Sequence, residues 1–339
     1  MDLTFNQLFK ACTKVLEGGR VPMITSKPGM GKSSLARALA DYYNLAFLDI
    51  RLTTYDTVSL NGYPTVDAAA NRSTFIPMGV IPIQGRDKLP KGKEGWLINF
   101  DELPDCNPTM QSAAYKILLD RYVGEHPIHD NGIKHGGAAH RLTGASKSRM
   151  VHFGLAPDAI GWCDWGTSAG IDYRLISFIQ EFPDLLNNFD IKTINDVDTF
   201  ACERTYEILS DCVKDEPAYD ETVLPVMHGC IGEAAATQLY SYVNIFAHLP
   251  SVDAIIKDPY VAGIPQEPSS RAALINKLVA HVDQSNIDPI FKYIKRFDSE
   301  YVMLAATRVL RKDRSFRTHP QIRTMVAQYS REFDFLKHK

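Results

Sequence analysis

The chain has 339 residues, of which 45% are hydrophobic and 23% charged, and its formal net charge is −3. This length allows two or three domains with apolar cores, and the composition is ordinary for a globular protein. The charge balance gives no general attraction to nucleic acid or acidic membranes, and no apolar stretch approaches the ~18–20 residues that span a bilayer.

The first residues lack the basic and apolar regions of a signal peptide. Six cysteines are scattered along the chain without a C-x-x-C pair, at Cys12, Cys106, Cys163, Cys202, Cys212 and Cys230. We therefore expect free thiols in a cytoplasmic protein.

Residues 3–17 carry apolar side chains at helical spacing, so they predict a helix that ends at Gly18-Gly19. The apolar run Val21-Pro22-Met23-Ile24 predicts a strand, and residues 35–40 predict the next helix. A glycine loop lies between this strand and helix, and we expect it to bind a nucleotide through Ser26, Lys27, Pro28, Gly29, Met30, Gly31, Lys32, Ser33 and Ser34.

Strand, glycine loop and helix are the context of a phosphate-binding loop with the pattern G-x-x-x-x-G-K-[ST]. The glycines let backbone N–H groups surround the phosphates, and the helix N-terminus adds partial positive charge. Lys32 is expected to reach the β- and γ-phosphates of ATP, and the Ser33 hydroxyl to bind Mg²⁺. Ser26 stands where the pattern has its first glycine.

Residues 46–52 predict a second strand, and residues 61–77 predict an exposed loop that is rich in Pro and Gly. The apolar run at residues 96–100 predicts a buried parallel strand, and it ends in Asp101-Glu102. Ligands bind at the carboxyl edge of such sheets. We expect Asp101 to hold Mg²⁺ through water and Glu102 to polarise the attacking water.

Residues 108–122 predict a helix, whereas residues 123–137 contain no convincing strand. Four histidines lie close together, at His126, His129, His135 and His140. Their spacing matches no zinc pattern and the glycines between them favour a polar loop, although a metal site is the alternative. Residues 149–153 predict another short strand after a basic edge.

From Pro157 onward the pattern is helical almost throughout, with helices expected at residues 173–182, 204–213, 234–249, 270–282 and 300–311. A basic run near the end of the last helix is either a solvated helix end or a phosphate-backbone contact, and it comprises Arg308, Arg311, Lys312, Arg314 and Arg317. The solvated end is favoured because no aromatic residues alternate with these charges.

With these motifs in place, the chain resembles the MoxR-type branch of the AAA+ ATPases, which includes CbbQ/NorQ-like activators. Three parts of the chain carry the resemblance. The first is Asp49-Ile50-Arg51-Leu52 followed by Asn61-Gly62-Tyr63-Pro64, and the second is residues 96–102 followed by the helix that ends Asp120-Arg121-Tyr122-Val123-Gly124-Glu125. The third is Ser148-Arg149-Met150-Val151-His152-Phe153. It implies an α/β P-loop NTPase (AAA+) core with a parallel sheet at residues 1–154. An all-helical lid at 155–249 and a C-terminal helical region at 250–339 follow.

The resemblance also implies roles for two arginines. Arg149 is the candidate arginine finger, supplied by the next subunit to stabilise the transferred phosphoryl group. Arg204, in Arg204-Thr205-Tyr206-Glu207, is the candidate second sensor on the lid. A site shared between subunits implies a ring, and the resemblance implies that it is hexameric. The resemblance also implies a client protein and a partner with a von Willebrand A domain.

One departure concerns the strand that ends in a sensor asparagine in this family. Only the glycine- and histidine-rich segment occupies that interval, and its single asparagine is Asn131. We therefore expect the central strand to be shortened or absent, with hydrolysis weakened.

The leading hypothesis is an ATP-hydrolysing ring ATPase, with ATP and Mg²⁺ as cofactors, that remodels or activates a client. One alternative is a nucleotide-gated assembly subunit without turnover, which the missing strand favours. The other is a nucleic-acid motor or loader, which the acidic net charge and the lack of an appended DNA-binding motif disfavour.

Overall fold

The computed structural model describes residues 2–69, 71–129, 134–138, 150–190 and 199–328. Its contacts divide the chain into two compact units, Met1–Pro157 and Asp158–Lys339. None of the helices in these ranges is long and apolar enough to cross a lipid bilayer. The further boundary expected near residue 249 stays a prediction.

The first unit is built around a parallel sheet with the strand order β1-β10-β2-β9-β6-β3. Its strands are β1 (Asp2–Leu3), β2 (Pro22–Thr25), β3 (Ala46–Arg51), β6 (Trp96–Asp101), β9 (Lys134–Ala138) and β10 (Val151–Leu155). Because the strands are parallel, their carboxyl ends meet at one edge, where α/β proteins bind ligands.

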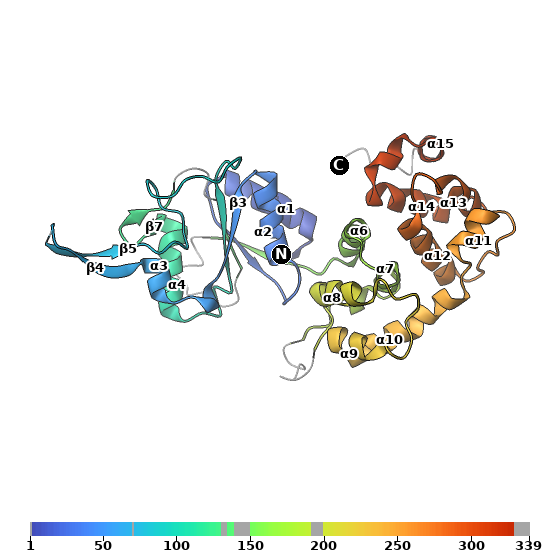
Figure 1. Cartoon of the computed structure of the whole chain (residues 1–339), viewed down its shortest axis with the longest axis horizontal. Helices are drawn as coiled ribbons and strands as arrows, with labels where there is room; N and C mark the ends of the chain where they lie inside the picture. Colours follow the sequence, from blue (N-terminus) through green and yellow to red (C-terminus); the bar gives the residue numbers. More distant parts are fainter. Residues whose placement is uncertain (1, 70, 130–133, 139–149, 191–198, 329–339) are drawn as a thin grey trace. The chain divides into compact units, whose positions relative to one another are not determined.

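Helices cover both faces of this sheet (Figure 1). Successive strand residues point to opposite faces, so Ile24 joins one apolar cluster and Met23 the other. The cluster of Ile24 contains α1 (Phe5–Glu17) and α2 (Lys32–Tyr42), and that of Met23 contains α4 (Pro108–Tyr115) with the π-helical turn Lys116–Asp120. The predicted α/β core with a parallel sheet is confirmed.

The central strand β9 corrects the expectation that residues 123–137 contain no strand. β9 pairs with β2 on one side, where Gly137 lies opposite Met23, and with β6 on the other, where Gly136 lies opposite Asn99. The strand is defined by backbone pairing with two neighbours, and its glycines carry no side chain that could give an apolar alternation. A periodicity search therefore cannot detect it.

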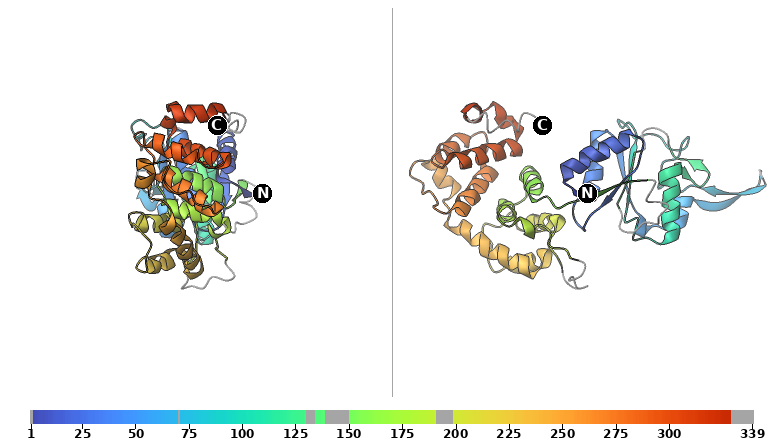
Figure 2. Two further views of the ribbon diagram at one scale, coloured as in Figure 1. Left: turned by 90° about the vertical axis from the view of Figure 1, so that its right-hand side faces the viewer. Right: turned by 180° about the vertical axis from the view of Figure 1, so that it is seen from behind.

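A two-stranded antiparallel ribbon projects from the first unit (Figures 1 and 2). It consists of β4 (Tyr63–Asp67) and β5 (Arg72–Ile76) and follows the short helix α3 (Thr57–Asn61). The imidazole of His126, in the small hairpin of β7 (Tyr122–Val123) and β8 (His126–Pro127), lies 2.8 Å from the Phe75 carbonyl oxygen. The exposed loop expected at residues 61–77 is thus an ordered, exposed hairpin.

The second unit is helical in its described part, as predicted. Its first helices are α6 (Ala159–Ala169), α7 (Tyr173–Glu181), α8 (Glu203–Val213), α9 (Leu224–Ile231) and α10 (Glu233–Val243), which share one apolar cluster. A second cluster is shared by α11 (Val252–Lys257), α12 (Pro268–His281), α13 (Ile287–Ile294), α14 (Ser299–Lys312) and α15 (Pro320–Gln328). Helix α12 contributes to both clusters, through Ala273 to the first and through Leu274 to the second.

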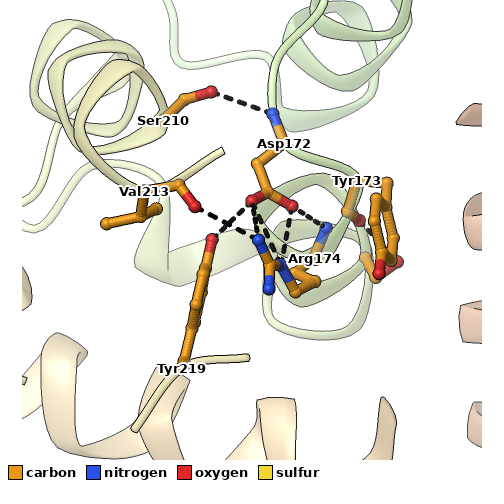
Figure 3. A network of polar contacts seen from close by, with 7 residues as sticks. Asp172, Tyr173, Arg174, Ser210, Val213 and Tyr219 are labelled. Atoms are coloured by element: carbon orange, nitrogen blue, oxygen red, sulfur yellow. Dashed lines mark hydrogen bonds and ion pairs between the residues drawn. The ribbon is translucent and has the colours of Figure 1, made fainter. Parts of the chain in front are cut away.

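A buried ionic network lies between α7 and α8 (Figure 3). The Asp172 carboxylate accepts hydrogen bonds from the Arg174 guanidinium, at 2.7 Å from Nη2, and from the Tyr219 hydroxyl at 2.7 Å. The guanidinium also donates to the Val213 carbonyl oxygen, and the Ser210 hydroxyl accepts from the Asp172 backbone N–H. Burial is the largest influence on Tyr219, and with the adjacent carboxylate it raises the pKa of that phenol.

The basic run at the end of α14 divides in two: Arg311, Arg314 and Arg317 are exposed, as expected of a solvated helix end, whereas Arg308 and Lys312 are engaged inside the second unit. The Arg308 guanidinium donates to the side-chain oxygens of Asn276 and Gln180, and its burial lowers its pKa to about 10. Arg311 forms an ion pair with Asp164. The Lys312 ammonium donates to carbonyl oxygens at the end of α12, those of Val279, Ala280 and Val282.

Candidate nucleotide-binding site

The loop between β2 and α2 has the backbone of an anion-binding turn. Gly29 and Gly31 adopt φ values of 75° and 81°, in the left-handed region that glycine enters without a steric penalty. Gly31 caps α2 without a side-chain hydrogen bond, and the first turn of α2 carries no acidic residue. The first N–H groups of an α-helix have no carbonyl partner within the helix, so this end can receive an anion, which the helix dipole favours.

The side chain of Lys32 folds back over this loop. Its ammonium donates to the Ser26 hydroxyl at 3.1 Å, and that hydroxyl donates in turn to the Lys27 carbonyl oxygen at 2.7 Å. Ser26, which stands where the pattern has its first glycine, thus contacts Lys32, the lysine of the pattern. Ser26 holds the positive charge next to the loop.

The acidic end of β6 meets the start of α2. The Ser33 hydroxyl donates to the Asp101 carboxylate at 3.3 Å, so the two residues predicted to serve Mg²⁺ lie together. The other carboxylate oxygen of Asp101 accepts the backbone N–H of Glu102 at 3.0 Å. A hydroxyl and a carboxylate provide the hard oxygen donors that Mg²⁺ prefers.

Glu102, the predicted water-polarising residue, is engaged by two side chains that sequence reasoning missed. Thr53 donates a hydrogen bond to one carboxylate oxygen, and Arg51 Nε lies 3.5 Å from the other. The register of β3 on β6 places Arg51 opposite Asp101, which explains the contact. Glu102 also has a φ of 58°, an uncommon conformation for a residue with a long side chain.

A buried polar pair supports the same strands from within. Asn99 is only 5% exposed, and its amide donates to the Asp49 carboxylate at 2.7 Å. The two residues lie opposite each other in the parallel pair β3–β6. This bond ties the strand that carries Asp101 to the strand that carries Arg51.

Arg149 and Asn131 lie outside the described residues. Arg204 is exposed in the first turn of α8, in the second unit.

Two of the four histidines have structural contacts in the first unit. His126 contacts the ribbon, as described above, and the His129 ring packs against Trp96 with centroids 4.8 Å apart. His140 lies outside the described residues, and only the backbone of His135 is described. Among the described residues, no group of three or more His, Cys, Asp or Glu side chains is arranged to hold a metal ion.

Comparisons with known proteins give distant likenesses only. No family model matches the chain, and no curated protein matches it. Two variants of Thermotoga maritima RuvB are 14% and 13% identical, each covering 85% of this chain and 89% of its own, with TM-scores of 0.40 and 0.37. A candidate ATPase from Cytophaga hutchinsonii is 11% identical over 96% of this chain and 88% of its own, with a TM-score of 0.32. Likenesses this distant carry no inference about function.

Proposed function

We propose that the chain binds and hydrolyses ATP as a MoxR-type AAA+ ATPase that remodels or activates a client protein as a ring oligomer. The observation that carries this proposal is the hydrogen bond between the Ser33 hydroxyl and the Asp101 carboxylate. It joins the phosphate-binding loop to the acidic strand in the combination that a nucleoside triphosphate with Mg²⁺ requires.

The residues at the sheet edge fit this ligand. Ser33 and Asp101 would hold Mg²⁺, which when bound neutralises charge on the β- and γ-phosphate oxygens. Lys32 would exchange the Ser26 hydroxyl for a phosphate oxygen, gaining a charge-assisted hydrogen bond. The uncapped N–H groups of α2 would receive the remaining phosphate oxygens.

Glu102 would act as the general base after leaving Thr53 and Arg51. A water oxygen forms a bond to the γ-phosphorus, and the bond from that phosphorus to the bridging oxygen breaks, giving ADP and inorganic phosphate. The water proton passes to the Glu102 carboxylate. In the present geometry this carboxylate is held by neighbouring side chains, so hydrolysis includes its release.

Ring assembly and the two arginines belong to the same proposal. Arg149 from an adjacent copy would stabilise the charge that develops on the transferred phosphoryl group. Arg204 would contact the phosphates from the helical unit and couple that unit to the nucleotide state. Turnover per chain would then depend on assembly.

The ribbon β4–β5 offers the surface that a client would contact. It exposes large apolar side chains of Tyr63, Val66, Phe75 and Ile76, at 63%, 74%, 41% and 56%. Exposed apolar residues gathered on one element are typical of protein interaction sites. Following the family resemblance, we propose a protein with a von Willebrand A domain as a client or partner.

The test is steady-state ATP hydrolysis over a range of protein concentrations. We expect turnover per chain to rise with concentration, Glu102→Gln to abolish turnover while retaining ATP binding, and Arg149→Ala to abolish turnover. Glu94→Gln is the matched control, because this exposed acid lies just before β6 and outside the site.

Two results would contradict the proposal. Wild type that binds ATP but shows no turnover, with or without a partner, would favour a nucleotide-gated assembly subunit. Stimulation by DNA or RNA would favour a nucleic-acid motor. The internal use of Arg308 and Lys312 in the second unit argues against that second alternative.

A further inference from the structure

The phosphate-binding loop is anchored to the interior of the first unit by one side chain. Met30 stands between Gly29 and Gly31, the two loop glycines with positive φ, and it is only 6% exposed. It belongs to the apolar cluster that contains Leu8 of α1 and Leu35 of α2. This cluster fixes the middle of the loop, whereas the glycines on either side have no side chain that could be packed.

The ring of Phe5 lies beside Gly31. A Cβ atom built on Gly31 would be 4.0 Å from Phe5 Cε2, which is an ordinary van der Waals distance. The other two of the three atoms nearest to that position belong to Ser34, in the first turn of α2. Phe5 therefore brings a distant part of the chain to the glycine that precedes Lys32.

The position of Phe5 is fixed on both sides along the chain. Before it, Leu3 pairs with Leu155 in the parallel sheet. At the start of α1, the backbone N–H of Thr4 donates to the Gln7 side chain at 3.1 Å, and the backbone N–H of Gln7 donates to the Thr4 hydroxyl at 3.5 Å. This capping box determines where the helix begins. Phe5, the first residue of α1, is thus held on a rigid support.

A ring beside a glycine limits the conformations that the empty loop can adopt. Glycine enters both the left-handed and the right-handed regions, so it loses more backbone entropy than any other residue when it becomes ordered. A phosphate is bound well only while the N–H groups of the loop point toward it. If the loop is ordered before the ligand arrives, the cost of ordering no longer reduces the affinity.

We propose that Phe5 is a positioning residue that holds Gly31 in the phosphate-binding conformation and so raises the affinity of the loop for the triphosphate of a nucleotide. The inference rests on the proposed nucleotide site, and it names a residue outside both nucleotide motifs. Phe5 acts on the loop and not on the nucleobase, so its effect is the same for ligands with and without a base.

The experiment measures the affinity of the full chain for ATP and for inorganic triphosphate by calorimetry with Mg²⁺, in a Glu102→Gln background that limits turnover. Phe5→Ala is expected to weaken the binding of both ligands by the same factor. This factor is about tenfold if the binding-competent loop falls from nearly all of the population to about one tenth of it. Phe5→Leu keeps apolar bulk beside Gly31 and should restore most of the affinity for both ligands.

Phe9→Ala is the matched control. Phe9 lies one turn further along α1, is also half-buried against the same apolar cluster, and packs its ring on Tyr42 with centroids 5.6 Å apart. Both alanine variants remove a phenyl ring from the same helix and should lower the midpoint of thermal unfolding alike, but only Phe5→Ala should weaken binding. With Glu102 intact, Phe5→Ala should raise the KM for ATP and leave kcat near that of wild type, because the loop holds the phosphates in the ground state and the transition state alike.

The possible results separate the inference from the proposed function. Unchanged affinity in Phe5→Ala, or a loss that Phe9→Ala shares, would overturn the inference. A loss for ATP alone, with unchanged binding of inorganic triphosphate, would place the ring at the nucleobase and would also overturn it. A parent chain that does not bind inorganic triphosphate would contradict the proposed phosphate site and the inference together. Binding without hydrolysis in wild type would contradict the ATPase activity alone.

Discussion

The Asp172–Arg174 pair makes the most quantitative prediction about the helical unit. The two side chains are 1% and 5% exposed, and the carboxylate accepts from the guanidinium, from the backbone N–H of Arg174 and from the Tyr219 hydroxyl. Asp172→Asn keeps the size of the side chain but leaves the Arg174 charge buried without a counter-charge.

Removing one partner of a buried ion pair costs about 3–5 kcal/mol. For a unit of this size, each kcal/mol lowers the midpoint of thermal unfolding by about 2–4 °C. We therefore expect Asp172→Asn to lower the midpoint by about 6–20 °C. Tyr219→Phe, which removes one hydrogen bond to a charged group and keeps the ion pair, should cost about 1.5–3 kcal/mol.

The assay is thermal unfolding followed by tryptophan fluorescence in a Trp96→Phe background. The remaining tryptophans, Trp162 and Trp165, both lie in the helical unit. Asp211→Asn is the matched control, because Asp211 pairs with Lys214 on the surface and such pairs stabilise little. Equal midpoints for Asp172→Asn and the control would refute the reasoning.

Three further predictions concern the nucleotide site. Thr53→Val removes a hydrogen bond to the partly exposed Glu102 carboxylate, and this bond is worth about 1 kcal/mol. Basal ATP turnover should therefore rise by about fivefold. A loss of turnover as large as that of Glu102→Gln would contradict this prediction. Ser33→Ala should raise the Mg²⁺ concentration for half-maximal hydrolysis by about tenfold or more, and an unchanged Mg²⁺ titration would show that the hydroxyl is not a ligand. Gly31→Ala has room for its methyl group, but the alanine must adopt a φ near 81°, which costs about 1–2 kcal/mol. The nucleotide affinity measured by calorimetry should therefore fall about tenfold. The control Gly79→Ala lies in open space at negative φ and should bind nucleotide as wild type does.

The sequence was sufficient for the features whose signals are local. The glycine loop, the acidic end of β6 and most long helices of the second unit depend on residues close together in the chain, and the structure has them where they were expected. The Ser33–Asp101 contact also followed, because parallel strands bring a loop and a strand end to the same edge.

The features that were missed depend on partners distant in sequence. The glycines of β9 give no periodic signal, and its position follows from pairing with both β2 and β6. Thr53 reaches Glu102 only because β3 and β6 are neighbours. The basic run was expected to be solvated, as Arg314 and Arg317 are, but a list of charges does not show that Lys312 faces the end of α12.

The backbone of Glu102 has a consequence for how this chain balances folding against activity. A glutamate with a φ of 58° occupies a conformation that glycine adopts at lower energy. Selection for stability alone would place glycine at this position, where it would relieve the strain and remove the carboxylate. The strained glutamate thus lowers the folding stability of the chain and provides the carboxylate for its chemical function. A screen for thermostable variants should therefore recover Glu102→Gly among inactive proteins.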